Sequence, residues 1–500
     1  MDSEATEMEE KKYIIEKSQS GEFTVPSDMG QLIEDEDQKR EQSNIPQASF
    51  NFINSIIGSG IIGMPYALKQ AGFPMGVLLI LIVALITDYS VILLIRGGNL
   101  SGTKNYQDLV RAAFGFPGFI FLSIVQFVYP FIAMISYNII TGDTITKVMM
   151  RISGVEVDEE TGQVYVTETN ILANRYFIIC LCTLFVTLPL SLYRNVAKLA
   201  KASLFACLLV VFIIIAVIIR STDMHIPPTE GAYTFAKPGF AQAVGIMAFS
   251  FVCHHNTFLI YGSLEEPTVH RWSIVTHISV VVSFIATVVF AACGYATFTG
   301  FTQGDVLENY CHEDDLINAA RFCYGVCIML TFPVECFVCR EVIENFFFQA
   351  AQPTTTLRHV IETVLIVGAT LGASLATDCL GIVLELNGTL GATPLVFILP
   401  AACYMKLEEG KFYSAKKLPS LLIVIAGAIV MVIGFIMAVL SPQGCSHGKE
   451  MSYCHANDVN ATDFSTFIPS TEMSMLASST VPSMISSTTT PFSNFSSIGP

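Results

Sequence analysis

The chain has 500 residues and is rich in apolar side chains, with 52% hydrophobic and only 14% charged residues. Soluble domains carry about 25% charged residues, so this composition excludes an ordinary soluble fold. The net charge of −16 argues against the basic surface that nucleic acid binding requires. The apolar residues form runs of about 20, the length that crosses a bilayer as a helix. The sequence therefore predicts an all-α integral membrane protein.

Three segments follow from this patterning. Residues 1–46 are acidic and lack a hydrophobic pattern, so we expect a disordered segment. Residues 47–440 hold eleven apolar spans, and residues 441–500 form a tail rich in Ser and Thr. The predicted spans, in chain order, are 47–69, 74–95, 117–146, 174–193, 199–219, 239–262, 274–299, 315–338, 359–377, 380–404 and 418–440.

The distribution of charge predicts how these spans are oriented. Short cytoplasmic loops carry an excess of Lys and Arg, and a cytoplasmic N-terminus places 18 of the 26 basic residues on that side. Because eleven is odd, the tail then lies outside the cell or in a lumen. Two N-glycosylation sequons in the tail, at Asn460 and Asn494, suit that side. We expect a multi-pass protein of the plasma membrane or of an endolysosomal membrane.

The first span contains features that a continuous helix does not tolerate well. Gly58, Ser59, Gly60 and a further glycine and proline fall within eight residues. A break at this depth frees backbone N–H and C=O groups, which are tolerated only where they line a cavity. Helix N-termini suit a substrate carboxylate, and freed carbonyls suit a cation. Close helix packing through the glycines is the alternative interpretation.

The sixth span carries a second polar interruption. It includes Phe249, Ser250, His254, His255 and Asn256. Such residues are costly in hydrocarbon and mark a functional site by default. A zinc site is disfavoured because adjacent histidines point to different faces of a helix. The alternative for each histidine is that it only satisfies a neighbouring backbone group.

Interrupted helices five spans apart are the sequence sign of an inverted-repeat transporter. We therefore expect two five-helix halves plus one additional helix, with the substrate at the two breaks. The expected substrate-binding residues are Gly58, Ser59, Gly60, Phe249, Ser250 and Asn256. Span one offers no fixed charge, which favours a neutral amino acid. No nucleotide-binding loop and no catalytic set of side chains is found, so the sequence indicates an ion-driven transporter without a cofactor, and not an enzyme.

The residues around these breaks resemble a known family. Asn51-Phe-Ile-Asn54-Ser-Ile-Ile-Gly58-Ser59-Gly60-Ile is similar to the first-helix signature of the amino acid/auxin permease family, and more narrowly of the sodium-coupled neutral amino acid transporters. The stretches Cys253-His-His-Asn256 and Leu330-Thr-Phe-Pro333 match as well, and the likeness runs from about 47 to 440. The resemblance implies a LeuT-like fold with eleven spans and sodium as the coupling ion.

By this resemblance, Asn54 and Thr331 occupy the positions of sodium-linked residues. Carbonyls around Ile53 and Ile56, freed by the break, are expected to complete the site. A simpler interpretation of Thr331 is that its hydroxyl bonds the carbonyl four residues earlier in its own helix. One departure from better-characterised relatives is that the loop 220–238 contains no Cys. The exposed cysteines are Cys311, Cys445 and Cys454, so any disulfide would differ.

Two alternatives to sodium-coupled transport remain open on sequence grounds. Transport could be linked to protons, with His254, His255 or Glu335 as the titrating group. Glu385 is a further candidate, and the alternative for Glu335 is a helix-end carboxylate near Arg340 or Arg321. The second alternative is a membrane amino acid sensor that signals through the segment 1–46. The identity of the amino acid and the oligomeric state do not follow from the sequence.

Overall fold

The computed structural model describes residues 43–153, 171–193, 197–224, 226–348, 355–440 and 451–454. The described residues up to Met451 belong to one compact unit. Within them, the secondary structure is helical, and the β pairing consists of an isolated parallel bridge between Ser43 and Leu264. The expected glycosylation sites Asn460 and Asn494, Cys445 and the segment 1–42 lie outside the described residues.

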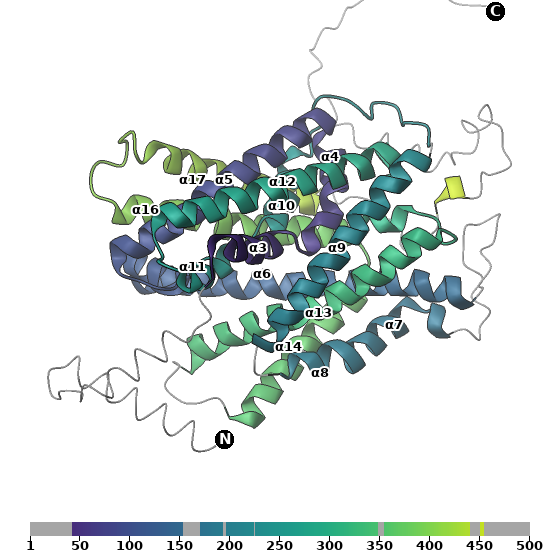
Figure 1. Cartoon of the computed structure of the whole chain (residues 1–500), viewed down its shortest axis with the longest axis horizontal. Helices are drawn as coiled ribbons and strands as arrows, with labels where there is room; N and C mark the ends of the chain where they lie inside the picture. The colour runs from purple at the N-terminus through teal and green to yellow at the C-terminus, as the bar shows by residue number, and fades with distance from the viewer. Residues whose placement is uncertain are drawn as a thin grey trace, which may run out of the picture. The chain divides into compact units, whose positions relative to one another are not determined.

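The helices follow the predicted spans closely, as the colours of Figure 1 allow the reader to trace. They are α3 (Ile45–Ile56), η1 (Ser59–Gly63), α4 (Met64–Ala71), α5 (Phe73–Ser101), α6 (Tyr106–Ser153), η2 (Ile171–Ala173), α7 (Arg175–Cys182), η3 (Thr183–Thr187), α8 (Leu188–Ser191), α9 (Ala197–Asp223), α10 (Phe240–Ser250), η4 (His254–Asn256), α11 (Thr257–Ser263), α12 (Val269–Phe298), η5 (Thr299–Phe301), η6 (Val306–Asn309), α13 (Asp315–Phe347), α14 (Thr356–Ala376), α15 (Leu380–Leu386), η7 (Asn387–Ala392), η8 (Pro394–Ile398), α16 (Leu399–Leu407), α17 (Leu418–Leu440) and η9 (Ser452–Cys454).

In the described part of the chain, 8 helical segments are long and apolar enough to cross a membrane. They coincide with eight of the predicted spans. The other three predicted spans fall on the interrupted segment from α3 to α4, on the shorter apolar helix Arg175–Ser191, and on α9. The all-α membrane fold is thus confirmed, while the total of eleven spans stays a prediction.

Local sequence explains where several helices begin and end. Gly72 separates α4 from α5 with φ of 87°, a conformation that favours glycine. Gly115 has φ of 68° and interrupts the helical geometry of α6 close to its start. Pro117 follows two residues later, so the continuous apolar part of α6 begins where the sequence predicts the third span to begin.

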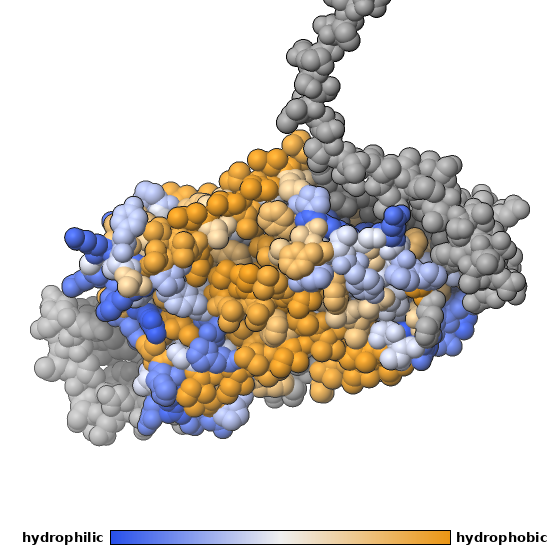
Figure 2. Space-filling model, turned by 90° about the horizontal axis from the view of Figure 1, so that it is seen from above, coloured by the Kyte–Doolittle hydropathy of each residue, from blue (hydrophilic) through white to orange (hydrophobic). Residues whose placement is uncertain are grey.

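Helix α10 lies at the centre of the unit and packs against α4, η1, α15, η7 and α17. The contact with η7 is so close that the carbonyl of Gly245 occupies the space that a Cβ on Gly388 would need. Around this centre, α12 runs beside α5 and also contacts α3 and α4 (Figure 1). Figure 2 shows apolar side chains over the middle of one face and polar side chains toward its two ends, the pattern expected of a protein that spans a bilayer.

Candidate functional site

The first span is broken at the predicted position. Helix α3 ends at Ile56, and Gly58 adopts an extended conformation with φ of −112° and ψ of −150° before the short helix η1 begins. No atom lies within 4 Å of the place where a side chain on Gly58 would begin. The break therefore leaves open space beside the backbone, as a ligand site requires.

The sixth span is broken in the same way. Helix α10 ends at Ser250, and a non-helical stretch leads to η4, which begins at His254. Because α11 resumes at Thr257, the span consists of two short helices joined by an irregular segment. Both interruptions that the sequence predicted are therefore present.

The two breaks meet. A Cβ on Gly60 would lie 2.5 Å from the Cα of Ser250, so η1 and the end of α10 are in close contact. The Asn256 amide nitrogen donates a hydrogen bond of 3.0 Å to the Ser55 hydroxyl of α3. The first half of span one thus pairs with the second half of span six, and the second half of span one pairs with α10.

Other predicted substrate residues face further elements. The ring of Phe249 lies 5.8 Å from that of Tyr129 on α6, and both side chains are buried. The His255 ring is 6.5 Å from the same tyrosine. The sequence analysis did not single out Tyr129 as a site residue, although an aromatic ring beside a proline in an apolar span could have drawn attention to it.

The residues expected at the ion site lie on two elements, α3 and α13. Ile57, directly after α3, packs against a cluster that includes Cys327 of α13. The Thr331 hydroxyl donates to the Cys327 carbonyl at 2.9 Å, so the simpler interpretation of Thr331 describes its bond correctly. Its oxygen still has a lone pair for a cation.

The carbonyls predicted to bind the ion already accept hydrogen bonds. The N–H of Ile57 donates to the Ile53 carbonyl at 2.8 Å, and the N–H of Gly58 donates to the Ile56 carbonyl at 2.9 Å. Each carbonyl oxygen has a second lone pair, so neither bond excludes a cation. Asn54 lies on α3, one turn before the break.

Of the three predicted proton-linked residues, His255 adjoins Tyr129, and the other two lie in different surroundings. His254 is buried, and its Nε2 lies 2.8 Å from the Ser90 hydroxyl of α5, while its Nδ1 has no partner in the described residues. Glu335 is buried on α13 and accepts a hydrogen bond of 3.4 Å from the Tyr137 hydroxyl of α6. This bond joins Glu335 to α6, and not to Arg340 or Arg321.

A buried carboxylate of span ten is better connected than any of these. Glu385 is fully buried and accepts hydrogen bonds from the side-chain amides of Gln70, at 3.1 Å, and Gln242, at 3.2 Å. The Tyr66 hydroxyl accepts a further hydrogen bond from the Gln70 amide at 2.9 Å. The network joins α4, α10 and α15. Sequence reasoning named Glu385 but missed both glutamines, although amides in apolar spans were a usable signal.

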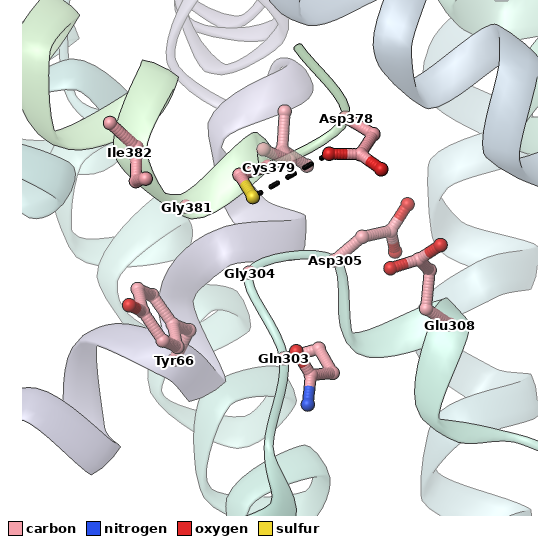
Figure 3. A pocket seen from close by; sticks show the side chains of 10 residues that line it. Tyr66, Gln303, Gly304, Asp305, Glu308, Asp378, Cys379, Gly381 and Ile382 are labelled. Atoms are coloured by element: carbon pink, nitrogen blue, oxygen red, sulfur yellow. Dashed lines mark hydrogen bonds between the residues drawn. The ribbon is translucent and has the colours of Figure 1, made fainter. Parts of the chain in front are cut away.

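Tyr66 also lines a small cavity, shown in Figure 3, that is bordered by carboxylates. The cavity has room for about one water molecule, ≈ 10 Å³. Asp305, Glu308 and Asp378 gather at one side of it, and one Asp305 oxygen has no hydrogen-bond partner in the described residues. Burial raises the pKa of the Asp305 carboxyl to about 7, and the nearby Glu308 adds to this effect.

Among the residues that the structure describes, Cys311, Cys379 and Cys454 take part in disulfide bonds. The sequence analysis considered Cys311 and Cys454 and did not include Cys379, because that residue lies at the predicted edge of span ten. Cys379 directly precedes the first residue of α15. Together with Asp378, it lines the cavity of Figure 3.

An all-helical membrane unit with two facing helix breaks defines a polytopic transporter of the LeuT-like fold class. A sequence profile of the family described as transmembrane amino acid transporter protein matches residues 41–440. The chain therefore belongs to this family of membrane amino acid transporters. It is not an enzyme by this membership.

Several curated relatives cover most of the chain. A Bos taurus protein named "Putative sodium-coupled neutral amino acid transporter 11" is 53% identical over 436 residues, covering 87% of this chain and 91% of the relative. The Danio rerio protein of the same name is 55% identical over 426 residues, covering 85% and 92%. The Saccharomyces cerevisiae "Vacuolar amino acid transporter 2" is 31% identical over 421 residues, covering 82% and 86%.

Two solved structures share the fold at low sequence identity. The structure of MhsT in complex with L-phenylalanine matches with a TM-score of 0.51 and 14% identity, covering 78% of this chain and 98% of MhsT. An Eremococcus coleocola manganese transporter matches with a TM-score of 0.50 and 11% identity, covering 79% and 88%. These likenesses concern the fold alone, and they agree with the LeuT-like fold expected from the sequence.

Proposed function

We propose that this protein moves neutral amino acids across a membrane by secondary active transport coupled to sodium. The observation that carries the proposal is the meeting of the two helix breaks, where Gly60 contacts Ser250 and open space adjoins Gly58. The names of the 50–55% identical relatives support both the substrate class and the coupling ion.

In this proposal the substrate carboxylate binds backbone N–H groups around Gly58, Ser59 and Gly60. The Gly58 N–H already donates to the Ile56 carbonyl, so the N–H groups of Ser59 and Gly60, at the start of η1, carry the main part of this contact. Phe249, Ser250 and Asn256 border the same region from span six, with Phe249 and Tyr129 forming an aromatic wall. A site built from backbone and neutral side chains suits a zwitterion without further net charge.

The sodium ion would bind between span one and span eight. Asn54 and the carbonyls of Ile53 and Ile56 supply oxygens from α3, and Thr331 supplies one from α13. The packing of Ile57 against the cluster of Ala206, Val210 and Cys327 supports this pairing, because Cys327 is one turn before Thr331. An ion that ties two helices favours the arrangement in which both are in place, so its gradient can drive the conformational cycle.

We propose the topology that the charge distribution predicts. The N-terminal segment is cytoplasmic, the tail 441–500 is extracellular or lumenal, and Asn460 and Asn494 are glycosylated. The membrane is the plasma membrane or an endolysosomal one. These assignments rest on the loop charges and sequons, since both segments lie outside the described residues apart from the stretches 43–46 and 451–454.

Uptake of a panel of labelled amino acids by the purified protein in vesicles tests the proposal. We expect uptake of small neutral amino acids that falls when sodium is replaced by choline. Uptake that persists without sodium but follows a pH gradient would favour proton coupling, for which the buried Glu335 and Glu385 supply carboxylates. Absence of uptake combined with specific binding would favour the sensor, whose signal should then require residues 1–40.

A further inference from the structure

One hollow in the described residues lies away from the two helix breaks. It measures ≈ 530 Å³, within the size range of small-molecule sites. It opens where the last turns of α5, the start of α12, the end of α16 and the loop before α17 come together. The side chains that line it are Tyr89, Arg96, Asn99, Leu100, Val269, Tyr404, Glu408 and Lys416.

Two cations in this hollow are available to a ligand. In the described part of the chain, neither the Arg96 nor the Lys416 side chain makes a hydrogen bond or an ion pair within the protein. Glu408 is the acidic side chain among the lining residues, so the hollow keeps a net positive charge. The Arg96 guanidinium, the Lys416 ammonium and the Asn99 amide together form a set of donors that suits a phosphate group.

The wall that carries Lys416 is held in place from within. The neighbouring Lys417 is buried, with 2% of its surface exposed, and its amino group donates to three carbonyls at the end of α16 and in the following loop. These acceptors are Met405 at 3.0 Å, Glu408 at 2.5 Å and Gly410 at 3.1 Å. A further hydrogen bond, of 3.2 Å, joins the hydroxyls of Tyr89 and Ser420. The hollow is therefore a formed feature and not a gap beside a loose loop.

The face of α5 that leads to the hollow is aliphatic. Three leucines of this face are exposed: Leu78, Leu85 and Leu100. The intervals from Leu85 to Tyr89, to Arg96 and to Leu100 are four, seven and four residues, so these side chains share one helix face. On α17, Leu422 is likewise exposed. Because α5 and α17 are both apolar enough to span a membrane, we expect this aliphatic surface to contact hydrocarbon. The cationic hollow lies at one end of it, beside Arg96.

We propose that the hollow binds the headgroup of an anionic glycerophospholipid, whose acyl chains lie along the exposed aliphatic side chains of α5 and α17. Arg96 and Lys416 contact the phosphate, and Tyr89 and Tyr404 border the headgroup at the depth where aromatic residues favour the membrane interface. A cationic pocket between helix ends, beside lipid-facing aliphatic residues, matches both parts of such a molecule. A soluble phosphate would use the cations only.

Native mass spectrometry of the detergent-purified full chain tests this site with phosphatidylserine as the anionic probe and phosphatidylcholine as the neutral one. The double variant Arg96→Ala, Lys416→Ala should weaken phosphatidylserine binding about 30-fold, since each interfacial cation contributes about a fivefold factor. The matched control Lys406→Ala, Lys411→Ala removes two exposed lysines of the same region that do not line the hollow, and it should retain wild-type binding. Glu408→Gln should strengthen binding.

The outcomes separate this site from general attraction to basic surfaces. Equal losses in the two double variants, or no loss in either, would overturn the assignment. Strong competition by inorganic phosphate, with no preference for the lipid over the free ion, would show that the hollow takes a soluble anion and would also overturn it. Lipid binding is measured without substrate or sodium, so the result stands apart from the test of transport.

Discussion

Gly60 and Ser250 are in contact where the two interrupted spans cross, and a Cβ on Gly60 would lie 2.5 Å from the Ser250 Cα. Gly60 therefore allows close packing, which is the alternative that the sequence analysis considered for these glycines. Gly58 differs, because open space adjoins its Cα. The two glycines of one short motif thus have separate structural roles, and substitutions at each should give different results.

We predict that Gly58→Ala weakens transport while leaving the protein folded. The added methyl group contacts nothing in the chain but enters the space proposed for the substrate carboxylate, so KM should rise several-fold. Gly60→Leu should instead abolish transport and lower the yield of folded protein, because α10 must move away. Uptake kinetics normalised to biotinylated surface protein measure both effects. Unchanged kinetics in Gly58→Ala would place the carboxylate elsewhere.

Sodium dependence should separate Thr331 from its helix-bonding role. Thr331→Ala removes the proposed ligand and should raise the sodium concentration for half-maximal uptake, as should Asn54→Ala. Thr331→Ser keeps the hydroxyl and its bond to the Cys327 carbonyl, so it should behave like the wild type. The measurement is uptake against sodium concentration. If the alanine and serine variants at 331 have the same sodium dependence, the hydroxyl is not a ligand.

In the Glu385 network, we expect the hydrogen bonds that Glu385 accepts to contribute more to stability than its negative charge does. Glu385→Ala leaves the Gln70 and Gln242 amides buried without that acceptor, at a cost of about 1–3 kcal/mol for each. Glu385→Gln retains an acceptor oxygen and should lose clearly less. Thermal unfolding of the purified variants in detergent compares them. Equal losses would mean that an amide oxygen cannot replace the carboxylate, so that the charge or the second acceptor oxygen carries the effect.

The buried Asp305 should make stability depend on pH. Its pKa is raised to about 7 in the folded protein, against about 3.9 in an unfolded chain. The folded state therefore binds the proton more tightly, and the stabilisation present at low pH is lost as the pH rises toward 7.

Asp305→Asn keeps an acceptor for the N–H of Leu307, which Asp305 binds at 2.8 Å, but removes the titration. The unfolding temperature of this variant relative to the wild type should rise between about pH 4 and pH 7. Asp315→Asn, at an exposed aspartate, serves as the control and should show no such rise. A constant difference across this range would contradict the prediction.

Glycosylation tests the proposed side of the tail. Glycosidase treatment of the protein expressed in animal cells should lower its mass, and changing Asn460 and Asn494 together to Gln should abolish that shift. Each single change should leave part of it. A shift that persists in the double variant would mean that another sequon is used and that the predicted orientation is wrong.

The sequence predicted the positions of the helices well, because each requires a long apolar run that is visible locally. It also located both breaks, since glycine and proline weaken a helix and clustered polar residues are costly in lipid unless they line a site. Contacts between distant segments were not predictable. Gln70 and Glu385 are separated by 315 positions, and nothing near either residue specifies the other.

The roles of single residues were likewise predictable where they depend on local sequence and not where they depend on distant contacts. The bond of Thr331 to its own helix is a local geometric tendency, and one of the two interpretations anticipated it. The irregular helices η7 and η8 were missed, because wide helical turns depend on packing against α6, α10 and α17 as much as on sequence. The contrast between Gly58 and Gly60 likewise depends on where α10 lies, which no local pattern gives.

The parallel bridge at Ser43 and Leu264 has a mechanical consequence. Backbone N–H groups of Ser43 and Glu265 donate across this bridge at 2.7 and 3.0 Å, and the bond from Asn256 to Ser55 lies further along the same pair of helices. Helices α3 and α11 are thus fastened at two points, while each is joined to the rest of its own span by a non-helical segment. A rearrangement that tilts one of them would carry the other with it as a single lever, turning about the segments near Gly58 and Cys253.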